Sequence, residues 1–118
     1  MGQLSEDLGR EAEEKAGRYL ESCGYTILER RFRCRFGDID LIFRDGDQVV
    51  FAEVKYRKDR RFGDPAEYIG AKKIGNLRLC ARAWQCVKGT EDMPCRFDVL
   101  ALVKEEGRWL CRHIRDAF

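Results

Sequence analysis

The sequence predicts one α/β domain over residues 1–118, in which helices flank a mixed sheet of about five strands. Three observations predict this class. A long amphipathic helix opens the chain, two alternating segments joined by a tight turn follow it, and a second helical segment precedes two further strands. The expected order is α-β-β-β-α-β-β, and its crossover helix favours a mixed sheet. A chain of 118 residues with 44% apolar residues builds one core and is too short for two domains.

The first quarter of the chain predicts a helix and then a strand. Apolar side chains recur at helical spacing over residues 4–23, with Ser5 as N-cap and Gly24 as the C-terminal stop. Residues 25–32 are rich in β-forming side chains, which predicts the first strand.

The clearest local signal is a β-hairpin. Residues 38–44 alternate polar and apolar side chains, residues 45–47 have turn chemistry, and residues 49–56 alternate again. The polar and basic segment 57–65 that follows predicts a mobile loop.

The second half predicts a helix and two strands. Asp64-Pro65 resembles a cap followed by proline at the first helical position, and helical spacing runs from Ile69 to Gly89. Residues 95–103 form a strongly apolar segment typical of a buried strand, and residues 109–114 predict the last strand after a Glu-Gly turn.

Composition excludes several classes of protein. No apolar run is long enough to span a bilayer, and the first ten residues lack an apolar signal core, so we expect a cytoplasmic protein without a membrane partner. The six cysteines form no CxxC pair, which favours buried free thiols over disulfides. His113 is the only histidine, and it is expected at the surface. Any catalysis would therefore use carboxylates, lysine and a hard metal ion.

The net charge of +2 hides a segregated pattern. Residues 30–36 carry four basic and no acidic side chains, and residues 53–88 carry ten basic and four acidic ones. Residues 37–52 between them carry one basic and four acidic side chains. Basic segments thus flank an acidic hairpin, an arrangement that favours contact with a phosphate backbone. Two solvated loops are the alternative.

Twelve residues separate Asp40 from Glu53 across the hairpin, and Lys55 follows two residues after Glu53. A turn at residues 45–46 pairs Asp40 with Phe51, whereas a turn at residues 46–47 pairs it directly with Glu53. Because both loops have even length, either register brings the two carboxylates to one face, and the lysine shares that face.

Paired carboxylates on strands that are otherwise apolar favour a divalent cation site. Oxygen ligands from one or two carboxylates, completed by water, suit Mg²⁺. Such an ion activates water for phosphodiester hydrolysis, and a nearby lysine can position the nucleophile. The alternative is a solvated strand face, and the spacing alone does not decide between the two. Asp98, another acid in an apolar strand, is expected to have a structural role as an ion-pair partner.

An ordered series of motifs resembles a known family. The segments GDIDLIF, VVFAEVKYRK, FGDP and CRFDVLAL, with Lys72-Lys73 opening a helix, are similar to the YraN-like bacterial proteins. This uncharacterised family is assigned to the PD-(D/E)xK nuclease superfamily, near archaeal Holliday-junction resolvases. The first helix, with Gly9, Glu13 and Ala16, fits the family pattern too, so the resemblance spans residues 8–103.

This resemblance implies a restriction-endonuclease-like fold and Mg²⁺- or Mn²⁺-dependent cleavage of DNA. By that resemblance Asp40 and Glu53 ligate the metal together with the carbonyl of Val54, Lys55 orients or deprotonates the attacking water, and Glu13 is an auxiliary acid. Resolvase-like relatives cut branched DNA as dimers, so a homodimer is expected.

The DNA-binding prediction comprises ten basic residues around this acidic centre: Arg30, Arg31, Arg33, Arg35, Arg57, Lys58, Arg60, Arg61, Lys72 and Lys73. The rival interpretation is a non-catalytic module that binds DNA or recruits a partner with the same fold. A general RNA-binding protein fits less well, since neither an RNP-like aromatic pattern nor a KH-type GxxG loop is present.

Overall fold

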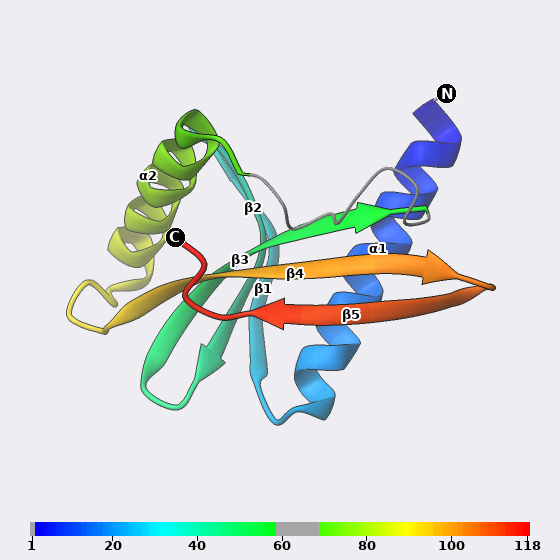
Figure 1. The fold of residues 1–118 in the computed structure, drawn as a ribbon. Coiled ribbons are helices and arrows are strands. Elements are labelled where there is room, and N and C mark those ends of the chain that lie inside the picture. The colour runs from blue at the N-terminus through cyan, green and yellow to red at the C-terminus, as the bar shows by residue number, and fades with distance from the viewer. Residues whose placement is uncertain (1, 59–68) are drawn as a thin grey trace.

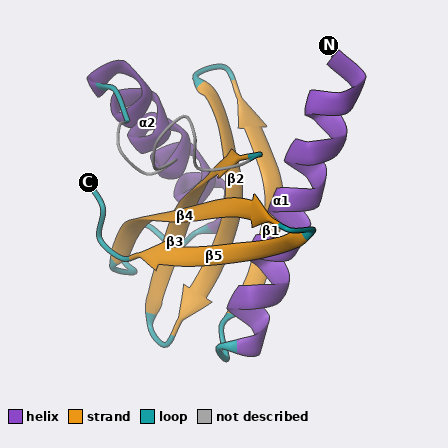
Figure 2. Cartoon of the chain, turned by 45° about the vertical axis from the view of Figure 1, so that its right-hand side comes forward, coloured by secondary structure: helices purple, strands orange, loops and turns teal. Residues whose placement is uncertain are grey.

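Two helices lie on opposite faces of a five-stranded sheet (Figures 1 and 2). The structure is a computed structural model that describes residues 2–58 and 69–118. The observed order confirms the predicted α-β-β-β-α-β-β arrangement and the mixed α/β class. The elements are α1 (Gly2–Ser22), β1 (Thr26–Cys34), β2 (Gly37–Asp45), β3 (Gln48–Arg57), α2 (Ala71–Lys88), β4 (Cys95–Glu105) and β5 (Arg108–Ile114).

The strands lie in the order β1-β2-β3-β4-β5. The first three form an antiparallel meander, as the tight turns predict. The chain then crosses over through α2, so that β4 runs parallel to β3, and β5 returns antiparallel to β4. This single parallel pair makes the sheet mixed and places β3 and β4 at its centre, where both of their faces are covered.

Helix α1 covers one face of the sheet through a stripe of small and aliphatic side chains. Ala12, Ala16 and Leu20 recur every four residues and are fully buried. The small side chains let the helix approach the central strands closely. They pack in one cluster with Leu41, Phe43, Val50, Ala52, Val54, Leu100 and Leu102.

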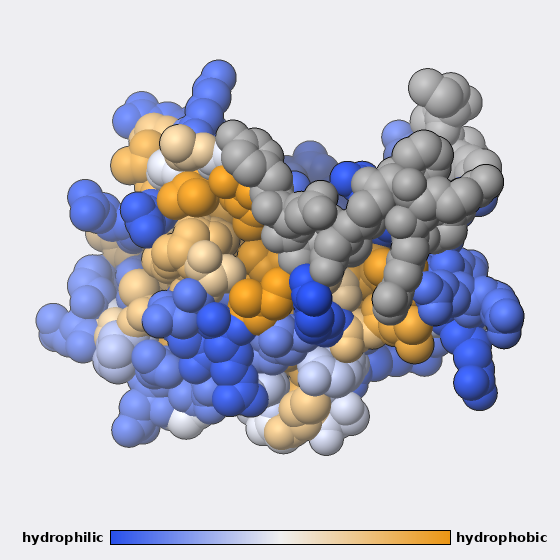
Figure 3. Space-filling model, viewed as in Figure 1, coloured by the Kyte–Doolittle hydropathy of each residue, from blue (hydrophilic) through white to orange (hydrophobic). Residues whose placement is uncertain are grey.

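Helix α2 covers the other face with a second apolar cluster, in which Leu77, Cys80, Ala81 and Trp84 are buried. On the sheet side Phe51 forms an edge contact with Trp84, with ring centroids 5.8 Å apart. Phe97 packs against Phe51, and Phe118 packs against Phe97, which extends this aromatic cluster. Figure 3 shows apolar residues gathered in the middle of the drawn face, with charged residues around them.

The start of α2 differs from the expectation. Gly70 is the N-cap with an extended backbone (φ −69°, ψ 155°), so the helix begins at Ala71 and Ile69 precedes it. The expected cap at Asp64-Pro65 lies outside the described residues. The predicted C-terminal stop is confirmed: Gly89 has φ 69°, ψ 32°, the left-handed conformation that glycine adopts readily.

All six cysteines are free, as expected, but only Cys80 is buried. Cys23, Cys86 and Cys95 are exposed because they lie at element ends or on the outer side of α2. Among residues 2–58 and 69–118, no helix is both long and apolar enough to cross a membrane.

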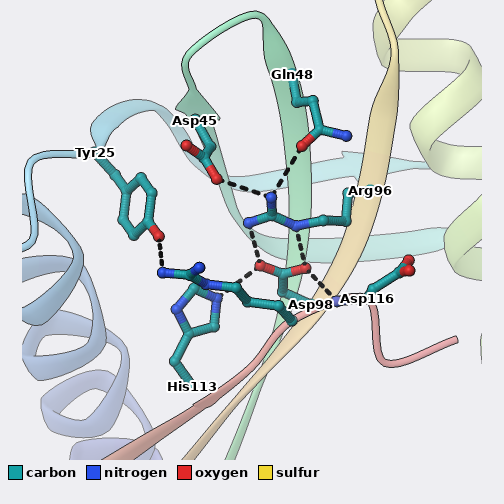
Figure 4. A network of polar contacts seen from close by, with 8 residues as sticks. Tyr25, Asp45, Gln48, Arg96, Asp98, His113 and Asp116 are labelled. Atoms are coloured by element: carbon teal, nitrogen blue, oxygen red, sulfur yellow. Dashed lines mark hydrogen bonds and ion pairs between the residues drawn. The ribbon is translucent and has the colours of Figure 1, made fainter.

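A buried ionic network joins β4 to the C-terminal residues (Figure 4). Asp98 is 0% exposed, and Arg96 donates to both of its carboxylate oxygens at 2.9 Å. The backbone N–H of Asp116 donates to Oδ1 at 2.9 Å, and His113 Nε2 lies 2.6 Å from Oδ2. His113 is therefore buried as an ion-network partner and is not the surface residue that its place near the C-terminus suggested. The expected structural role of Asp98 is confirmed.

The same arginine reaches the β2–β3 turn. Arg96 Nη1 contacts Asp45 Oδ2 at 2.8 Å and Gln48 Oε1 at 3.0 Å. Burial by itself would raise the pKa of Asp98, but the hydrogen bonds from His113 and Arg96 outweigh it and lower the pKa to about 2. The network therefore ties the hairpin turn, the central strand and the C-terminal residues together.

Replacing Asp98 with asparagine removes the buried charge that Arg96 and His113 contact and leaves Arg96 with Asp45 as its carboxylate partner, so we expect a loss of on the order of 3 kcal/mol in the free energy of unfolding. The exposed Asp92→Asn variant serves as control and should stay close to wild type. Because the folded pKa lies below the unfolded one, the wild type gains this stability above about pH 4 and loses it as the pH falls towards 2. Urea unfolding between pH 2 and pH 7 measures both effects. Equal stability of Asp98→Asn and wild type at pH 7 would contradict this assignment.

Candidate active site

The candidate site lies where β2 and β3 separate. The two strands pair from Asp45–Gln48 to Leu41–Ala52, which confirms the two-residue turn at positions 46–47. Beyond that point the first part of β2 pairs only with β1, as in the pair Arg33–Asp38. The last part of β3 continues along β4 as far as Arg57. The hairpin therefore opens into a fork at Asp40 and Glu53.

Asp40 closes the inner end of this fork. Its Oδ2 accepts a hydrogen bond from the backbone N–H of Val54 at 2.8 Å. In a continuing antiparallel ladder such an N–H would bond to the neighbouring strand, so the carboxylate replaces a missing strand partner. The side chain is thereby fixed at the point of separation.

Glu53 is nearly buried, with 7% of the residue exposed. Its Oε2 atom is enclosed and has no hydrogen-bond partner among residues 2–58 and 69–118. Lys73, in the first turn of α2, forms an ion pair with this carboxylate, and its Nζ lies 3.6 Å from Oε2. A buried carboxylate oxygen without a donor is costly, and it indicates a position suited to a cation.

Burial opposes the ionisation of both carboxylates, and the charge of Glu53 further opposes that of Asp40. Burial, followed by the charge of Glu53, raises the pKa of Asp40 to about 8, although the N–H of Val54 opposes this shift. Burial also raises the pKa of Glu53, against the opposing charges of Lys73 and Lys55. Such a pair is stabilised either by uptake of a proton or by a cation.

Asp38 adds to this negative potential, a contribution that the sequence reasoning did not assign. Its charge raises the pKa of both Asp40 and Glu53. The alternation of Asp38 and Asp40 along one strand was the available signal. Among the residues that the structure describes, no group of three or more His, Cys, Asp and Glu side chains is arranged to hold a metal. A cation at the fork would therefore have two carboxylate ligands, with backbone oxygen and water completing its shell.

Glu13 reaches the site from the other face of the sheet, on α1. Both of its carboxylate oxygens contact Nη2 of Arg31, at 2.5 and 2.6 Å. Its charge contributes to the raised pKa of Asp40. The pair borders a cleft of about 570 Å³ between α1 and the strands, which Arg10, Arg33 and Tyr56 also line.

The structure separates the ten predicted DNA-binding residues into groups. Arg33 is exposed on β1 and Arg35 in the turn that follows it, Arg57 and Lys58 are exposed at the end of β3, and Lys72 is exposed at the start of α2. Three others have partners within the protein: Arg30 lies against Gly17 of α1, Arg31 binds Glu13, and Lys73 faces Glu53. Arg60 and Arg61 lie outside the described residues.

The roles of Arg31 and Lys73 as carboxylate partners were missed by the sequence reasoning. Arg31 and Glu13 are 18 positions apart, and Lys73 and Glu53 are 20 apart, on different elements. Charge clustering marked both cations, but it does not say whether a cation faces a phosphate or a carboxylate.

The chain matches the family described as "Uncharacterised protein family UPF0102" over residues 12–102, a range that includes Glu13, Asp40, Glu53 and Lys55. A UPF0102 protein of Hahella chejuensis is 47% identical over 94 residues, which cover 80% of this chain and 76% of that protein. A relative from Syntrophomonas wolfei is 40% identical over 117 residues, covering 98% of this chain and 100% of the relative. A third, from Nitrosococcus oceani, is 40% identical over 113 residues, covering 95% and 91%. The chain therefore belongs to the UPF0102 family, as its resemblance to the YraN-like proteins predicted.

Proposed function

We propose that this protein is a metal-dependent endonuclease that hydrolyses phosphodiester bonds of DNA, with branched or otherwise structured DNA as its substrate. The observation that carries this proposal is the enclosed Oε2 of Glu53, which finds no hydrogen-bond partner in the described part of the chain and lies beside Asp40 in the fork. A purely structural ion pair would satisfy that oxygen with a donor. A site that binds a cation leaves it open.

Asp40 and Glu53 would hold Mg²⁺ or Mn²⁺ together with the main-chain carbonyl of Val54. This donor set is made only of oxygen atoms, which hard divalent cations prefer. The Asp40 contact to the N–H of Val54 fixes the carboxylate before any ion arrives. When bound, the ion supplies Lewis acidity that lowers the pKa of water and neutralises charge on a phosphoryl oxygen.

Lys55 stands two residues after Glu53 on β3, so the two side chains leave the strand on the same face. Its positive charge lowers the pKa of Glu53, which indicates that the two groups are close. In the proposed reaction the Lys55 ammonium donates a hydrogen bond that orients the attacking water, and the proton of that water passes to Lys55 when its amine is neutral. Glu13, across the fork, is the auxiliary acid.

Exposed cations around the fork would bind the phosphate backbone. The exposed cations near the acidic centre come from β1 and the turn after it, from the end of β3, and from the start of α2: Arg33, Arg35, Arg57, Lys58 and Lys72. Contacts of this kind are independent of base sequence and weaken as salt rises. A branched substrate requires two cuts, and we propose a homodimer for that reason.

Cleavage of fluorescent branched, flapped, single-stranded and duplex DNA tests the catalytic proposal. With Mg²⁺ or Mn²⁺ the wild type should cut, and excess chelator should stop it. Glu53→Gln and Lys55→Met should each lower the rate about 100-fold or more, because each removes a group that acts on the reacting atoms.

The matched controls are Glu91→Gln and Lys15→Met, two exposed residues away from the fork, and both should cut like wild type. DNA cleavage by the Glu53→Gln and Lys55→Met variants at the wild-type rate would show that the site assignment is wrong. Salt-sensitive DNA binding without metal-dependent cutting would contradict the catalytic proposal and favour the non-catalytic module.

Replacing Asp40 with asparagine should stabilise the metal-free protein. The folded pKa of about 8 lies above the unfolded value, so the free energy of unfolding of the wild type falls as the pH rises from about 4 to about 8. Asparagine keeps an acceptor for the N–H of Val54 and removes this charge. In chelator at pH 9 we expect Tm to rise by roughly 5 °C, and the exposed Asp47→Asn to leave it unchanged.

Thermal unfolding with Mg²⁺ provides the second half of this comparison. Mg²⁺ should raise the Tm of the wild type more at pH 9 than at pH 5, since protons compete for Asp40, and it should raise that of Asp40→Asn much less. A lower Tm for Asp40→Asn in chelator at pH 9 would show that the carboxylate charge stabilises the fold and would count against a cation site.

A further inference from the structure

We propose that Arg31 couples cation binding at the fork to phosphate binding in the adjoining cleft. In the free protein its guanidinium holds Glu13 and offsets the acidic side chains. In the complex with nucleic acid it turns to a backbone phosphate and releases Glu13 towards the cation. This inference rests on the proposed function, because it concerns the regulation of the same site.

The first support is the contact itself. Both hydrogen bonds to Glu13 come from Nη2 of Arg31, at 2.5 and 2.6 Å. The Arg31 side chain is 43% exposed and that of Glu13 is 20% exposed. The guanidinium therefore lies on the solvent side of the carboxylate and covers it. An exposed ion pair of this kind contributes little to folding, and its partners can exchange at low cost.

The second support is the backbone of Arg31, which has φ 51°. This left-handed conformation is uncommon for a long side chain and is preferred by glycine and asparagine. Arg31 lies between the β1–β2 pairs Arg30–Leu41 and Phe32–Ile39, which places it opposite Asp40 in that register. The strained residue is thus located directly beside the fork, and strain of this kind clusters at functional sites.

The third support is the set of charges that Arg31 faces. Glu13, first by hydrogen bonding and then by charge, raises the pKa of the Arg31 guanidinium, and Asp40 and Asp38 raise it further. The same guanidinium therefore offsets negative charge on three carboxylates from two elements. A divalent cation placed at Asp40 and Glu53 would repel it, since two like charges at short range oppose each other.

The cleft beside Arg31 gives the guanidinium a place to move. Its volume is about 570 Å³, and Arg10 and Arg33 line it together with Arg31. Its three guanidinium groups outnumber the two carboxylates of Glu6 and Glu13 that also line it, and arginine binds phosphate oxygens with paired hydrogen bonds. Tyr56 from β3 forms another part of the wall, so the cleft extends towards the end of the strand that carries Glu53 and Lys55.

Such an exchange makes the two ligands cooperative. The cation drives Arg31 away from the acids, and the phosphate holds it away, so each ligand should strengthen the binding of the other by the same factor. Metal alone or DNA alone would then bind less tightly than the two together.

Calorimetric titration of Ca²⁺ into the full chain tests this, with and without a short DNA duplex. Arg31→Asn suits the left-handed backbone and lacks the charge. Without DNA it should bind Ca²⁺ about 5- to 10-fold more tightly than wild type. The factor by which DNA tightens Ca²⁺ binding should fall from about 10 in wild type to about 1 in the variant.

Arg10→Gln is the matched control. It removes from the same cleft a guanidinium whose carboxylate partner is Asp7 on the outer side of α1, so it should weaken DNA binding while leaving Ca²⁺ affinity without DNA as in wild type. Unchanged or weaker Ca²⁺ binding by Arg31→Asn, or a coupling factor equal to that of wild type, would overturn the inference.

The Glu53→Gln variant distinguishes a failure of the Arg31 role from a failure of the cation site itself. If it abolishes Ca²⁺ binding while Arg31→Asn behaves like wild type, the cation site stands and only the role of Arg31 is wrong. If Ca²⁺ binds to Glu53→Gln as it does to wild type, the cation site of the proposed function fails as well, and with it the coupling.

Discussion

The hydrogen bond from the N–H of Val54 to Asp40 is the contact on which the rest of the site depends. A hairpin whose strands stayed paired would satisfy this N–H within the ladder and would leave no room between Asp40 and Glu53. Because β2 and β3 part at this point, a side-chain carboxylate takes the place of a backbone carbonyl. The separation of the two strands therefore both creates the opening and fixes the carboxylate of Asp40 at its edge.

The surrounding fold makes that separation possible. The hairpin is held at its turn by Arg96, which reaches both Asp45 and Asp98, and the apolar strands beyond it are covered by helices on both faces. With the closed end of the hairpin secured, the open end can present charged groups at little cost to the core. Lys73 from α2 and Glu13 from α1 then converge on the fork from opposite faces of the sheet.

Much of the architecture could be predicted because local signals and the global fold agree. Helical spacing located α1 and most of α2, and alternation with an Asp-Gly-Asp turn located the hairpin and left two possible registers. Asp40 and Glu53 could be named as a pair because any loop of even length brings them to one face. The end of pairing at Leu41–Ala52 could not be predicted, since it depends on how β1 and β4 draw the two strands apart.

The residue environments that the sequence did not predict have a common physical cause. His113 was expected at the surface, yet β5 pairs it beside the buried Asp98, a contact that only the tertiary structure creates. Arg31 and Lys73 were assigned to DNA by charge alone, although each faces a carboxylate from a distant segment. Ion pairs between elements far apart in the chain leave no periodic signal in the sequence, whereas turns and amphipathic faces do.

The most direct test of the account is a crystal structure of the protein grown with Mn²⁺, with anomalous scattering used to locate the ion. The account predicts one ion in the fork, at about 2.0 to 2.4 Å from carboxylate oxygens of both Asp40 and Glu53. An empty fork at saturating Mn²⁺, with Lys73 bonded to Oε2 of Glu53, would contradict it.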